Sequence, residues 1–399
     1  MVKKILFFRI RLTIFVMMLC LSARILPVDA QGVQPASIIS TRVICSQPGR
    51  YVGWPTIAMT AEKDLLVVFS GDRDAHVCPW GKTQMIRSSD QGATWSDPVT
   101  INNSPLDDRD AGIMRTDAGT MIASWFTSVY FIYAFEDEDA RWPAEMRDGW
   151  ARHIGKISAE TREDWLGNWI RRSGDSGLTW GERINTFVNS PHGPIQLSDG
   201  RLLYVGMNKI VGDRKGQNPP DSMRIAAVES IDDGLTWKII GYIPVPKYLD
   251  PGAKAFHEAH AVETAEGKII AMLRHHGEPG KHYLWQSESS DGGSSWTMAH
   301  QTKIWGYPPH LIRLKNDWLV VSYGYRREPF GNRACISRDD GSTWDVKNQV
   351  ILSIAPNYDL GYPASVQLED GTIYTVYYQA PADGELTRLM GTHWRIDRY

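Results

Sequence analysis

An eight-residue pattern, S-x-D-x-G-x-[TS]-W, occurs five times in the chain and limits its fold more than any other feature. The copies are Ser88–Trp95, Ser173–Trp180, Ser230–Trp237, Ser289–Trp296 and Ser337–Trp344. Aspartate can bond the backbone two residues further on, glycine supplies the positive φ of a tight turn, and threonine suits an outgoing strand. The pattern therefore predicts a hairpin tip with a structural role. Its repetition indicates a fold built from repeated sheet units.

Each copy ends a longer unit, in which a short apolar strand, an acidic or glycine-containing corner and a second apolar strand come first. Nearly continuous apolar runs, typical of strands buried on both faces, mark the second strands. They are Leu65–Phe69, Met121–Trp125, Leu202–Val205, Ile269–Leu273, Leu319–Tyr323 and Ile373–Tyr377. These six strands predict six units. The last has room for only three strands, so we expect Ser37–Cys45 to supply its outer strand and close the ring.

The five patterns resemble the Asp boxes, or BNR repeats, of the sialidase superfamily. The resemblance implies an all-β fold, a six-bladed β-propeller that forms a single domain over residues 31–399. The long first interval between boxes indicates an insertion at about residues 129–171, in the second blade. We expect helices there at Ala144–Ile154 and Ala159–Ile170, with Ser158 as an N-cap. A lid, a helical patch and an oligomer contact are equally compatible with this insertion.

The first 30 residues are typical of a secretory signal peptide, with a basic start, the apolar run Leu12–Leu21 and a small-residue site at Val28–Ala30. A secreted or periplasmic protein is therefore expected. The apolar run is short for a membrane span, and none is expected in the mature chain. Without these residues, 38 Lys and Arg oppose 45 Asp and Glu, a net charge of −7. Such a charge argues against a nucleic-acid partner.

Candidate site residues gather where each first strand starts and each second strand ends, since propeller strands alternate in direction. Aligned on the corners, the blades offer one level of first-strand residues: Pro55, Asp110, Pro191, Glu258, Pro308 and Tyr362. Histidines and cations fall close to this level: Arg73, His192, His260, Arg274, His310 and Arg326. Polar groups that converge on a concave face are the usual sign of a binding site.

Sialidases use a tyrosine nucleophile, a glutamate that activates it, an aspartate acid/base and three arginines that bind the substrate carboxylate. Gly361-Tyr362-Pro363 resembles the segment that carries the tyrosine. Glu258, sixteen residues before Arg274, resembles the spacing of the glutamate and the second arginine. Arg333 falls near the third arginine, with Arg326 as a competitor. The resemblance thus implies Tyr362 as nucleophile and Glu258 as its base, which a phenol of pKa about 10 requires.

The first blade departs from the family pattern. The family has an Arg-Ile-Pro motif where this chain has Gly53-Trp54-Pro55, so the first arginine is absent unless Arg50 or Arg73 replaces it. The expected position of the aspartate acid falls on His76, with Asp74 close by. Both are candidates for the acid/base, because histidine can also exchange protons near neutral pH.

The expected function is a secreted, exo-acting glycoside hydrolase of sialidase type that cleaves a terminal acidic sugar, sialic acid or a related one. Two alternatives stay open: a polysaccharide lyase on uronic-acid glycans using histidine and tyrosine, and a non-catalytic glycan-binding propeller. An anionic glycan is the expected partner, and no cofactor or metal is expected. The residues expected to bind it are Arg73, Asp110, His192, His260, Arg274, His310, Arg326 and Arg333.

Overall fold

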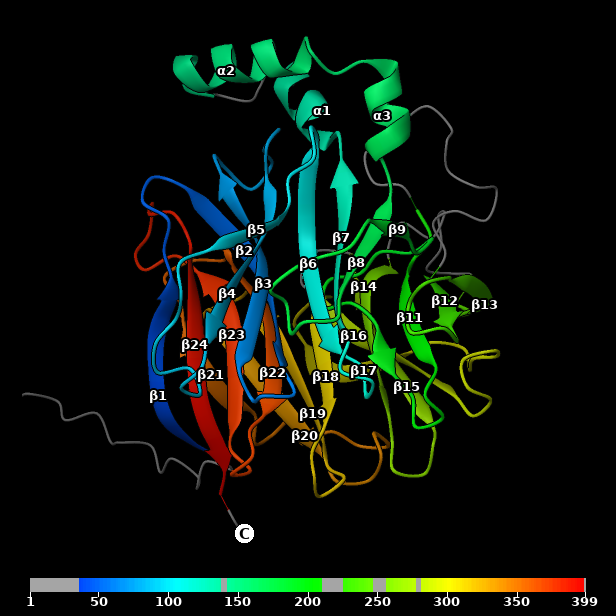
Figure 1. Cartoon of the computed structure of the whole chain (residues 1–399). Helices are drawn as coiled ribbons and strands as arrows, with labels where there is room; N and C mark the ends of the chain where they lie inside the picture. Colours follow the sequence, from blue (N-terminus) through cyan, green and yellow to red (C-terminus); the bar gives the residue numbers. More distant parts are fainter. Residues whose placement is uncertain (1–35, 138–141, 210–224, 247–255, 278–280, 398–399) are drawn as a thin grey trace, which may run out of the picture. The chain divides into compact units, whose positions relative to one another are not determined.

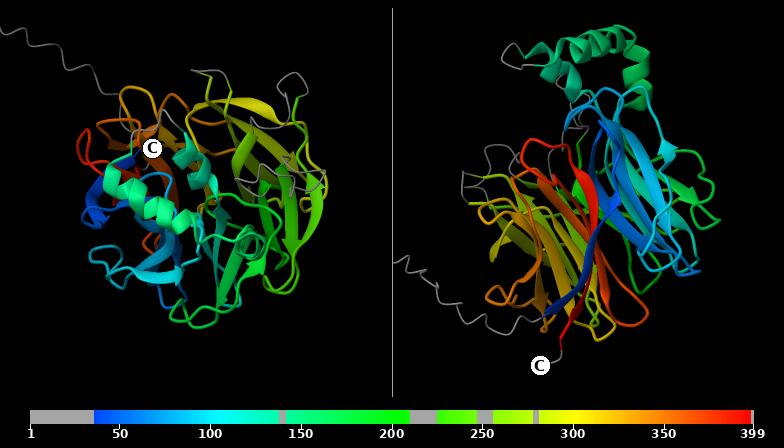
Figure 2. Two further views of the ribbon diagram at one scale, coloured as in Figure 1. Left: turned by 90° about the horizontal axis from the view of Figure 1, so that it is seen from above. Right: turned by 90° about the vertical axis from the view of Figure 1, so that its left-hand side faces the viewer.

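The computed structural model describes residues 36–137, 142–209, 225–246, 256–277 and 281–397. The predicted signal peptide, residues 1–30, lies outside the described residues and stays a prediction. Within residues 36–397, six antiparallel sheets of four strands each are arranged as a six-bladed β-propeller (Figures 1 and 2). None of the helices described in these ranges is long and apolar enough to cross a membrane.

The blades follow one another along the chain. The first blade contains β2 (Tyr51–Met59), β3 (Leu65–Arg73), β4 (Lys82–Ser88) and β5 (Val99–Asn102). The second contains β6 (Asp107–Arg115), β7 (Met121–Ser128), β8 (Asn168–Ser173) and β9 (Ile184–Asn185). The third contains β10 (Ile195–Gln196), β11 (Leu202–Met207), β12 (Ile225–Ser230) and β13 (Lys238–Tyr242). The fourth blade contains β14 (Phe256–Glu263), β15 (Ile269–His275), β16 (Tyr283–Ser289) and β17 (His300–Trp305). The fifth contains β18 (Pro309–Arg313), β19 (Leu319–Tyr325), β20 (Gly331–Ser337) and β21 (Val350–Ile354).

The sixth blade joins the two ends of the propeller. It contains β22 (Leu360–Gln367), β23 (Ile373–Gln379), β24 (Arg388–Ile396) and, as its outer strand, β1 (Ala36–Cys45). The register of β1 on β24 runs from Ala36 opposite Ile396 to Cys45 opposite Leu389. The predicted ring closure by Ser37–Cys45 is therefore confirmed.

The Asp boxes form hairpin tips between the third and fourth strands, as predicted. In the first box, Asp90 accepts hydrogen bonds from the Thr94 backbone N–H (2.8 Å) and from the Thr94 hydroxyl (2.6 Å). Ser88 Oγ accepts a bond from the Gly92 N–H at 2.8 Å, and Gly92 has φ +87°. These bonds lower the pKa of Asp90 to about 2. The other four boxes repeat the same bonds.

The insertion in the second blade is helical and lies between β7 and β8. It contains α1 (Tyr130–Glu136), α2 (Ala144–Ile154) and α3 (Ala159–Trp165), at the end of the propeller away from the Asp boxes (Figure 1). The bounds of α2 and the Ser158 cap, whose Oγ accepts a bond from Thr161 N–H at 3.0 Å, agree with the prediction. The predicted helix to Ile170 was too long, because Asn168–Ser173 pairs with β7 as a strand. The sequence pattern gave no sign of α1.

Candidate functional site

Five blades place a residue with positive φ at the same level of the first strand or just before it. These residues are Trp54 (54°), Asp110 (52°), His192 (77°), Glu258 (49°) and Tyr362 (52°). In four of the blades a β-bulge coincides with this residue; Glu258 and Ala259, for example, lie opposite the single residue Leu273. Bulges redirect side chains, and non-glycine residues with this backbone cost roughly 1 kcal/mol or more, so they cluster at functional sites.

This level corrects the sequence alignment in two blades. The alignment placed Pro55 and Pro191 there, but the residues with positive φ are their neighbours, Trp54 before Pro55 and His192 after Pro191. Trp54 is thus the first-blade counterpart of Asp110, Glu258 and Tyr362. Its side chain is 1% exposed and does not reach solvent.

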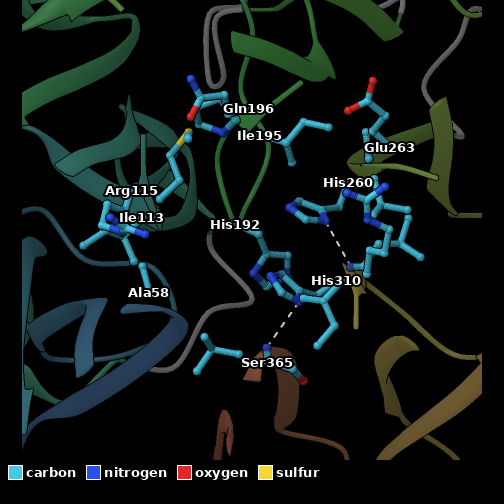
Figure 3. Close-up of a pocket in the computed structure, with 18 of the residues that line it drawn as sticks. Ala58, Ile113, Arg115, His192, Ile195, Gln196, His260, Glu263, His310 and Ser365 are labelled. Atoms are coloured by element: carbon cyan, nitrogen blue, oxygen red, sulfur yellow. Dashed lines mark hydrogen bonds between the residues drawn. The ribbon is translucent and has the colours of Figure 1, made fainter. Parts of the chain in front are cut away.

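Three of the predicted histidines line a cavity of about 540 Å³ that lies further along the first strands, toward the Asp-box end (Figure 3). We call it the channel cavity; His192, His260 and His310 are among its polar lining residues. The rings of His260 and His310 stack at 4.5 Å, and His192 lies 4.9 Å from His310. His260 Nδ1 accepts a bond from Leu311 N–H (3.0 Å) and His310 Nδ1 from Ser365 N–H (3.2 Å).

These histidines therefore line a different cavity from the other predicted site residues, although the His192 ring lies 6.4 Å from the Tyr362 ring. Burial lowers the pKa of His260 to about 3, and the pKa values of His192 and His310 are also well below the ordinary value. The imidazoles are neutral hydrogen-bonding groups at the centre of the ring of blades. Within the described ranges, no group of three or more His, Cys, Asp or Glu side chains is arranged to hold a metal ion.

A second cavity, of about 420 Å³, opens where the first strands start; we call it the mouth cavity. It brings together six of the predicted residues: His76, Asp110, Glu258, Arg274, Arg326 and Tyr362. Five further polar residues line it, Arg109, Asn189, Lys209, His257 and His276, and the insertion contributes Tyr130 from the start of α1. Polar side chains from all six blades thus meet around one hollow.

Tyr362, Glu258 and Arg274 form a connected group in the wall of the mouth cavity. The Tyr362 hydroxyl donates a hydrogen bond to Glu258 Oε1 at 2.8 Å. Arg274 Nη1 donates to Glu258 Oε2 at 2.6 Å and lies 3.3 Å from the Tyr362 hydroxyl. Burial and the nearby carboxylate raise the pKa of Tyr362 well above its ordinary value. Burial opposes ionisation of Glu258, but Arg274 and His257 hold its pKa well below the usual range.

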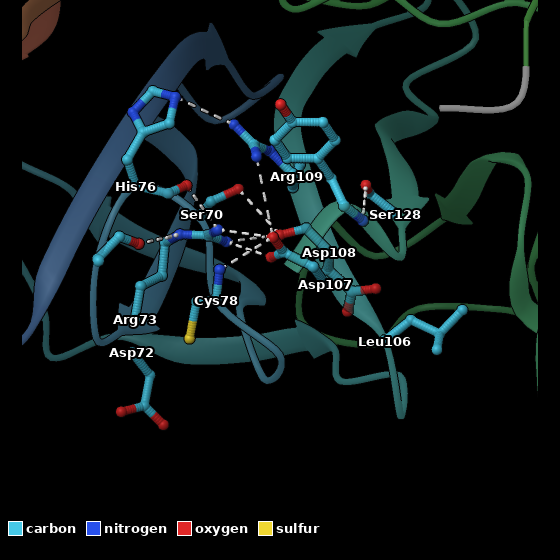
Figure 4. A network of polar contacts seen from close by, with 12 residues as sticks. Ser70, Asp72, Arg73, His76, Cys78, Leu106, Asp107, Asp108, Arg109 and Ser128 are labelled. Atoms are coloured by element: carbon cyan, nitrogen blue, oxygen red, sulfur yellow. Dashed lines mark hydrogen bonds and ion pairs between the residues drawn. The ribbon is translucent and has the colours of Figure 1, made fainter. Parts of the chain in front are cut away.

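Arg109 is a cavity residue that the sequence reasoning missed. Its guanidinium lies 4.7 Å from the centroid of the Trp54 ring, and its Nη2 lies 3.3 Å from His76 Nε2 (Figure 4). Its Nε is buried and has no hydrogen-bond partner among the described residues. The available signal was position, because Arg109 directly precedes Asp110 at the level where polar residues gather.

Besides the three histidines, three further predicted residues lie outside the mouth cavity and have other partners. Arg73 is fully buried and pairs with Asp107 at 2.7 Å (Figure 4). Its guanidinium lies 4.8 Å from the Trp54 ring centroid. Arg333 lies over the Tyr325 ring at 3.3 Å.

Asp74 is the third of these residues. It pairs with Arg50 and accepts a bond from the Trp150 indole N–H at 2.8 Å. Neither Arg50 nor Arg73, the two residues considered as replacements for the missing arginine, lines the mouth cavity.

Two cavity residues have strongly shifted proton affinities. Enclosure and the guanidiniums of Arg109 and Arg73 lower the pKa of His76 well below its ordinary value, so the imidazole is neutral. Burial raises the pKa of Asp110 to about 7, with Glu258 adding to the effect and Arg109 opposing it. Asp110 Oδ1 is buried without a hydrogen-bond partner in the described part of the chain.

A six-bladed propeller with five Asp boxes and a polar cavity at the mouth is the architecture of the sialidase superfamily. The family model of the BNR repeat-like domain matches residues 149–375. The chain belongs to this family, as a divergent member of the superfamily. A sialidase from Paraclostridium sordellii is 22% identical over 223 residues, which cover 53% of this chain and 48% of that protein, about half its length.

Solved structures agree with the fold. A protein of unknown function from Dyadobacter fermentans superposes with a TM-score of 0.70 at 22% identity, over 91% of this chain and 100% of that chain. A sialidase from Streptococcus pneumoniae superposes with a TM-score of 0.60 at 14% identity, over 91% of this chain and 71% of that chain. Identities this low establish the propeller and leave the sugar to be inferred from the site.

Proposed function

We propose that this protein is an exo-acting glycoside hydrolase that cleaves a terminal anionic sugar, sialic acid or a related one, from glycans. The observation that carries the proposal is the 2.8 Å hydrogen bond from the Tyr362 hydroxyl to Glu258 in the wall of the mouth cavity. A buried phenol is a weak nucleophile until a base takes its proton, and the ionised Glu258 is placed to do so. A tyrosine nucleophile is a known exception to the two-carboxylate scheme of glycosidases.

The charge of the cavity supports an anionic substrate. Arg109, Arg274 and Arg326 line it, and only two carboxyl groups, Asp110 and Glu258, oppose them among its described residues. The Nε groups of Arg109 and Arg274 are buried without partners in the described ranges. Guanidinium groups bind carboxylates through charge-assisted hydrogen bonds, so these donors suit the carboxylate of an acidic sugar. A neutral tyrosine also attacks beside that carboxylate without charge repulsion.

Arg326 is held in place as part of this arrangement. Its Nε and Nη2 donate to the Leu360 carbonyl at 2.9 and 2.7 Å, and Nη2 also donates to the Tyr378 hydroxyl at 3.1 Å. These bonds fix the edge of the guanidinium that Nε and Nη2 form. A preorganised cation of this kind loses little conformational entropy when substrate binds.

The test is turnover of 4-methylumbelliferyl N-acetylneuraminic acid by the purified protein, with Tyr362→Phe alongside. Turnover that the substitution abolishes supports the proposal. Release of an unsaturated, ultraviolet-absorbing product from a uronic-acid glycan would instead identify a lyase. Binding of acidic glycans without turnover of any of them, and with affinity retained in Glu258→Gln, would identify a binding propeller.

Export is also part of the proposal, since residues 1–30 are typical of a signal peptide. Mass spectrometry of the protein recovered outside the cytoplasm of an expressing cell tests it. A mature chain that starts close to residue 31 agrees with the proposal, and a chain that keeps its first residues in the cytoplasm contradicts it.

A further inference from the structure

The carboxylate of Asp74, in the first blade, binds the helical insertion to the propeller. One of its oxygens pairs with Arg50 and the other accepts the 2.8 Å bond from the indole of Trp150. Trp150 is fully buried in α2, so this bond joins the insertion to the loop after β3. Both oxygens of Asp74 therefore already accept bonds from other side chains of the protein. The acid of the reaction must come from elsewhere in the cavity.

His76 lines the cavity but is poorly suited to donate a proton. Its Nε2 lies 3.3 Å from the Arg109 guanidinium, and its Nδ1 lies 3.3 Å from the Tyr51 hydroxyl. A protonated imidazole there would face a permanent cation at hydrogen-bond distance. The ring is therefore neutral at neutral pH, and a neutral imidazole is a weak acid.

Asp110 has the placement that the other two lack. It lies in the β-bulge of the second blade, at the level that Glu258 and Tyr362 occupy in the fourth and sixth blades. All three line the mouth cavity, so they approach it from alternate blades. Asp110 is 6% exposed, and its Oδ1 has no hydrogen-bond partner among the described residues. A buried polar atom without a partner in a cavity wall is an atom that a ligand can satisfy.

The surroundings of Asp110 favour its protonated form. Burial and the charge of Glu258 together raise the pKa of the carboxyl to about 7, against the opposing effect of Arg109, Arg73 and Arg274. The negative charge of Asp110 in turn raises the pKa of three nearby phenols, those of Tyr204, Tyr362 and Tyr378. A carboxyl that holds its proton near neutral pH can act as a general acid, and once ionised it can act as a base.

We infer that Asp110 is the acid/base of this site, in place of the first-blade residues. The inference rests on the proposed function. As the Tyr362 oxygen bonds to the anomeric carbon, the phenolic proton passes to Glu258. The glycosidic C–O bond breaks with its electron pair on the leaving oxygen, which takes the proton of Asp110. Water then attacks the anomeric carbon and gives a proton to Asp110, while the C–O bond to Tyr362 breaks and the phenolate recovers its proton from Glu258.

The first test compares leaving groups. A good leaving group such as 4-methylumbelliferone needs little protonation, whereas the sugar alcohol of sialyllactose needs a proton as its bond breaks. We expect Asp110→Asn to lower kcat/KM for sialyllactose by about 10²–10⁴-fold, the usual contribution of a general acid. The loss for the aryl glycoside is expected to be at least ten times smaller. The matched control, Asp74→Asn, should lower the melting temperature and leave the ratio of the two substrates unchanged.

The possible outcomes separate the two proposals. If the wild type hydrolyses both substrates and Asp110→Asn loses both equally, Asp110 is not the proton donor although the proposed function stands. The same holds if Asp74→Asn shows the leaving-group dependence. If the wild type hydrolyses neither substrate, the proposed function fails, and the role of Asp110 in that reaction fails with it.

A second measurement follows the protonation of the Asp110 carboxyl directly and needs no turnover. Asp108 and Asp110 both have a pKa of about 7, because both are buried. Carbon-13 labelling of the aspartate carboxyls should therefore show two resonances that titrate near pH 7 in the wild type. Asp110→Asn should remove one and Asp74→Asn neither. If Asp110→Asn keeps both resonances, the inference is wrong, even if the protein is an active enzyme.

Discussion

The hydroxyl of Tyr362 and the carboxylate of Glu258 meet at 2.8 Å although 104 residues separate them along the chain. Each residue sits on a bulge of its own blade with a positive φ, 52° for Tyr362 and 49° for Glu258. The same local distortion, repeated in two blades, turns both side chains toward one cavity. The hydrogen bond is therefore a product of the repeat and needs no special loop.

Glu258→Gln keeps the shape of the side chain and removes the base. We expect kcat on an aryl sialoside to fall by about 10²–10⁴-fold, because the phenol of Tyr362 keeps its proton. Steady-state kinetics measure the loss. Glu263→Gln, on the same strand but bonded to Ser198 at the other end of the propeller, is the control. Equal activity of the two variants would show that Glu258 is not the base.

Arg109→Gln should weaken the binding of an acidic sugar. Loss of a charge-assisted contact costs about 1.5–3 kcal/mol, or about 10–150-fold in affinity. Calorimetric titration with the unsaturated analogue of N-acetylneuraminic acid measures the change. Arg333→Gln removes an arginine that lies over Tyr325 outside the mouth cavity, and we expect it to bind with wild-type affinity. The reverse order of the two variants would assign the third cation to Arg333.

The buried histidines should make the protein less stable as pH falls. The pKa of His260 is lowered to about 3 by burial, while the unfolded value is about 6.5. Above pH 6.5 neither state binds the proton; below it only the unfolded state does, so stability falls by about 1.4 kcal/mol per pH unit for each such histidine. The protonated Asp108 and Asp110 act in the opposite direction between about pH 4 and 7, so the comparison must be with a variant.

His260→Gln isolates one histidine from these opposing groups. Between pH 7.5 and 5.5, we expect its free energy of unfolding to fall by about 1.4 kcal/mol less than that of the wild type. Urea denaturation at the two pH values measures both changes. Parallel changes in the wild type and the variant would mean that His260 is protonated in the folded protein at pH 5.5.

Trp150→Phe should loosen the insertion and leave the propeller intact. The substitution keeps most of the buried ring area but removes the indole bond to Asp74, at a cost of about 1–3 kcal/mol. Hydrogen–deuterium exchange should become faster in α2, with the strands unchanged. Trp142→Phe alters the ring that lies 4.8 Å from Trp150 and does not touch Asp74. If only Trp142→Phe accelerates exchange in α2, the indole bond does not hold the insertion.

The fold could be predicted because every blade repeats the same local chemistry. The Asp boxes fix the hairpins between the third and fourth strands, and the apolar runs fix the second strands. Tyr362, Glu258 and Arg274 came with the family resemblance, and the structure brings these three side chains together. The place of a residue in its blade can therefore be predicted from the sequence where the repeat is regular.

The rest of the site depended on displacements of one or two residues. Pro55 marked the aligned level in the first blade, but the bulge puts Trp54 there, and Arg109 occupies the space above that ring. His260 comes two residues after Glu258 and so lies deeper along the strand, in the channel cavity. Bulge register and depth along a strand come from tertiary packing, and no single-sequence pattern reports them.

The pairing of β1 with β24 has a consequence for the order in which the blades are completed. The sheet that carries Tyr362 takes its outer strand from residues 36–45 and its neighbour from residues 388–396, so it cannot be completed before residues 388–396 have been synthesised. Each of the first five blades is built from one continuous stretch of chain, whereas the sixth must hold its first strand, β1, unpaired until β24 exists. A chain cut before residue 388 would leave both β1 and β23 with an open edge.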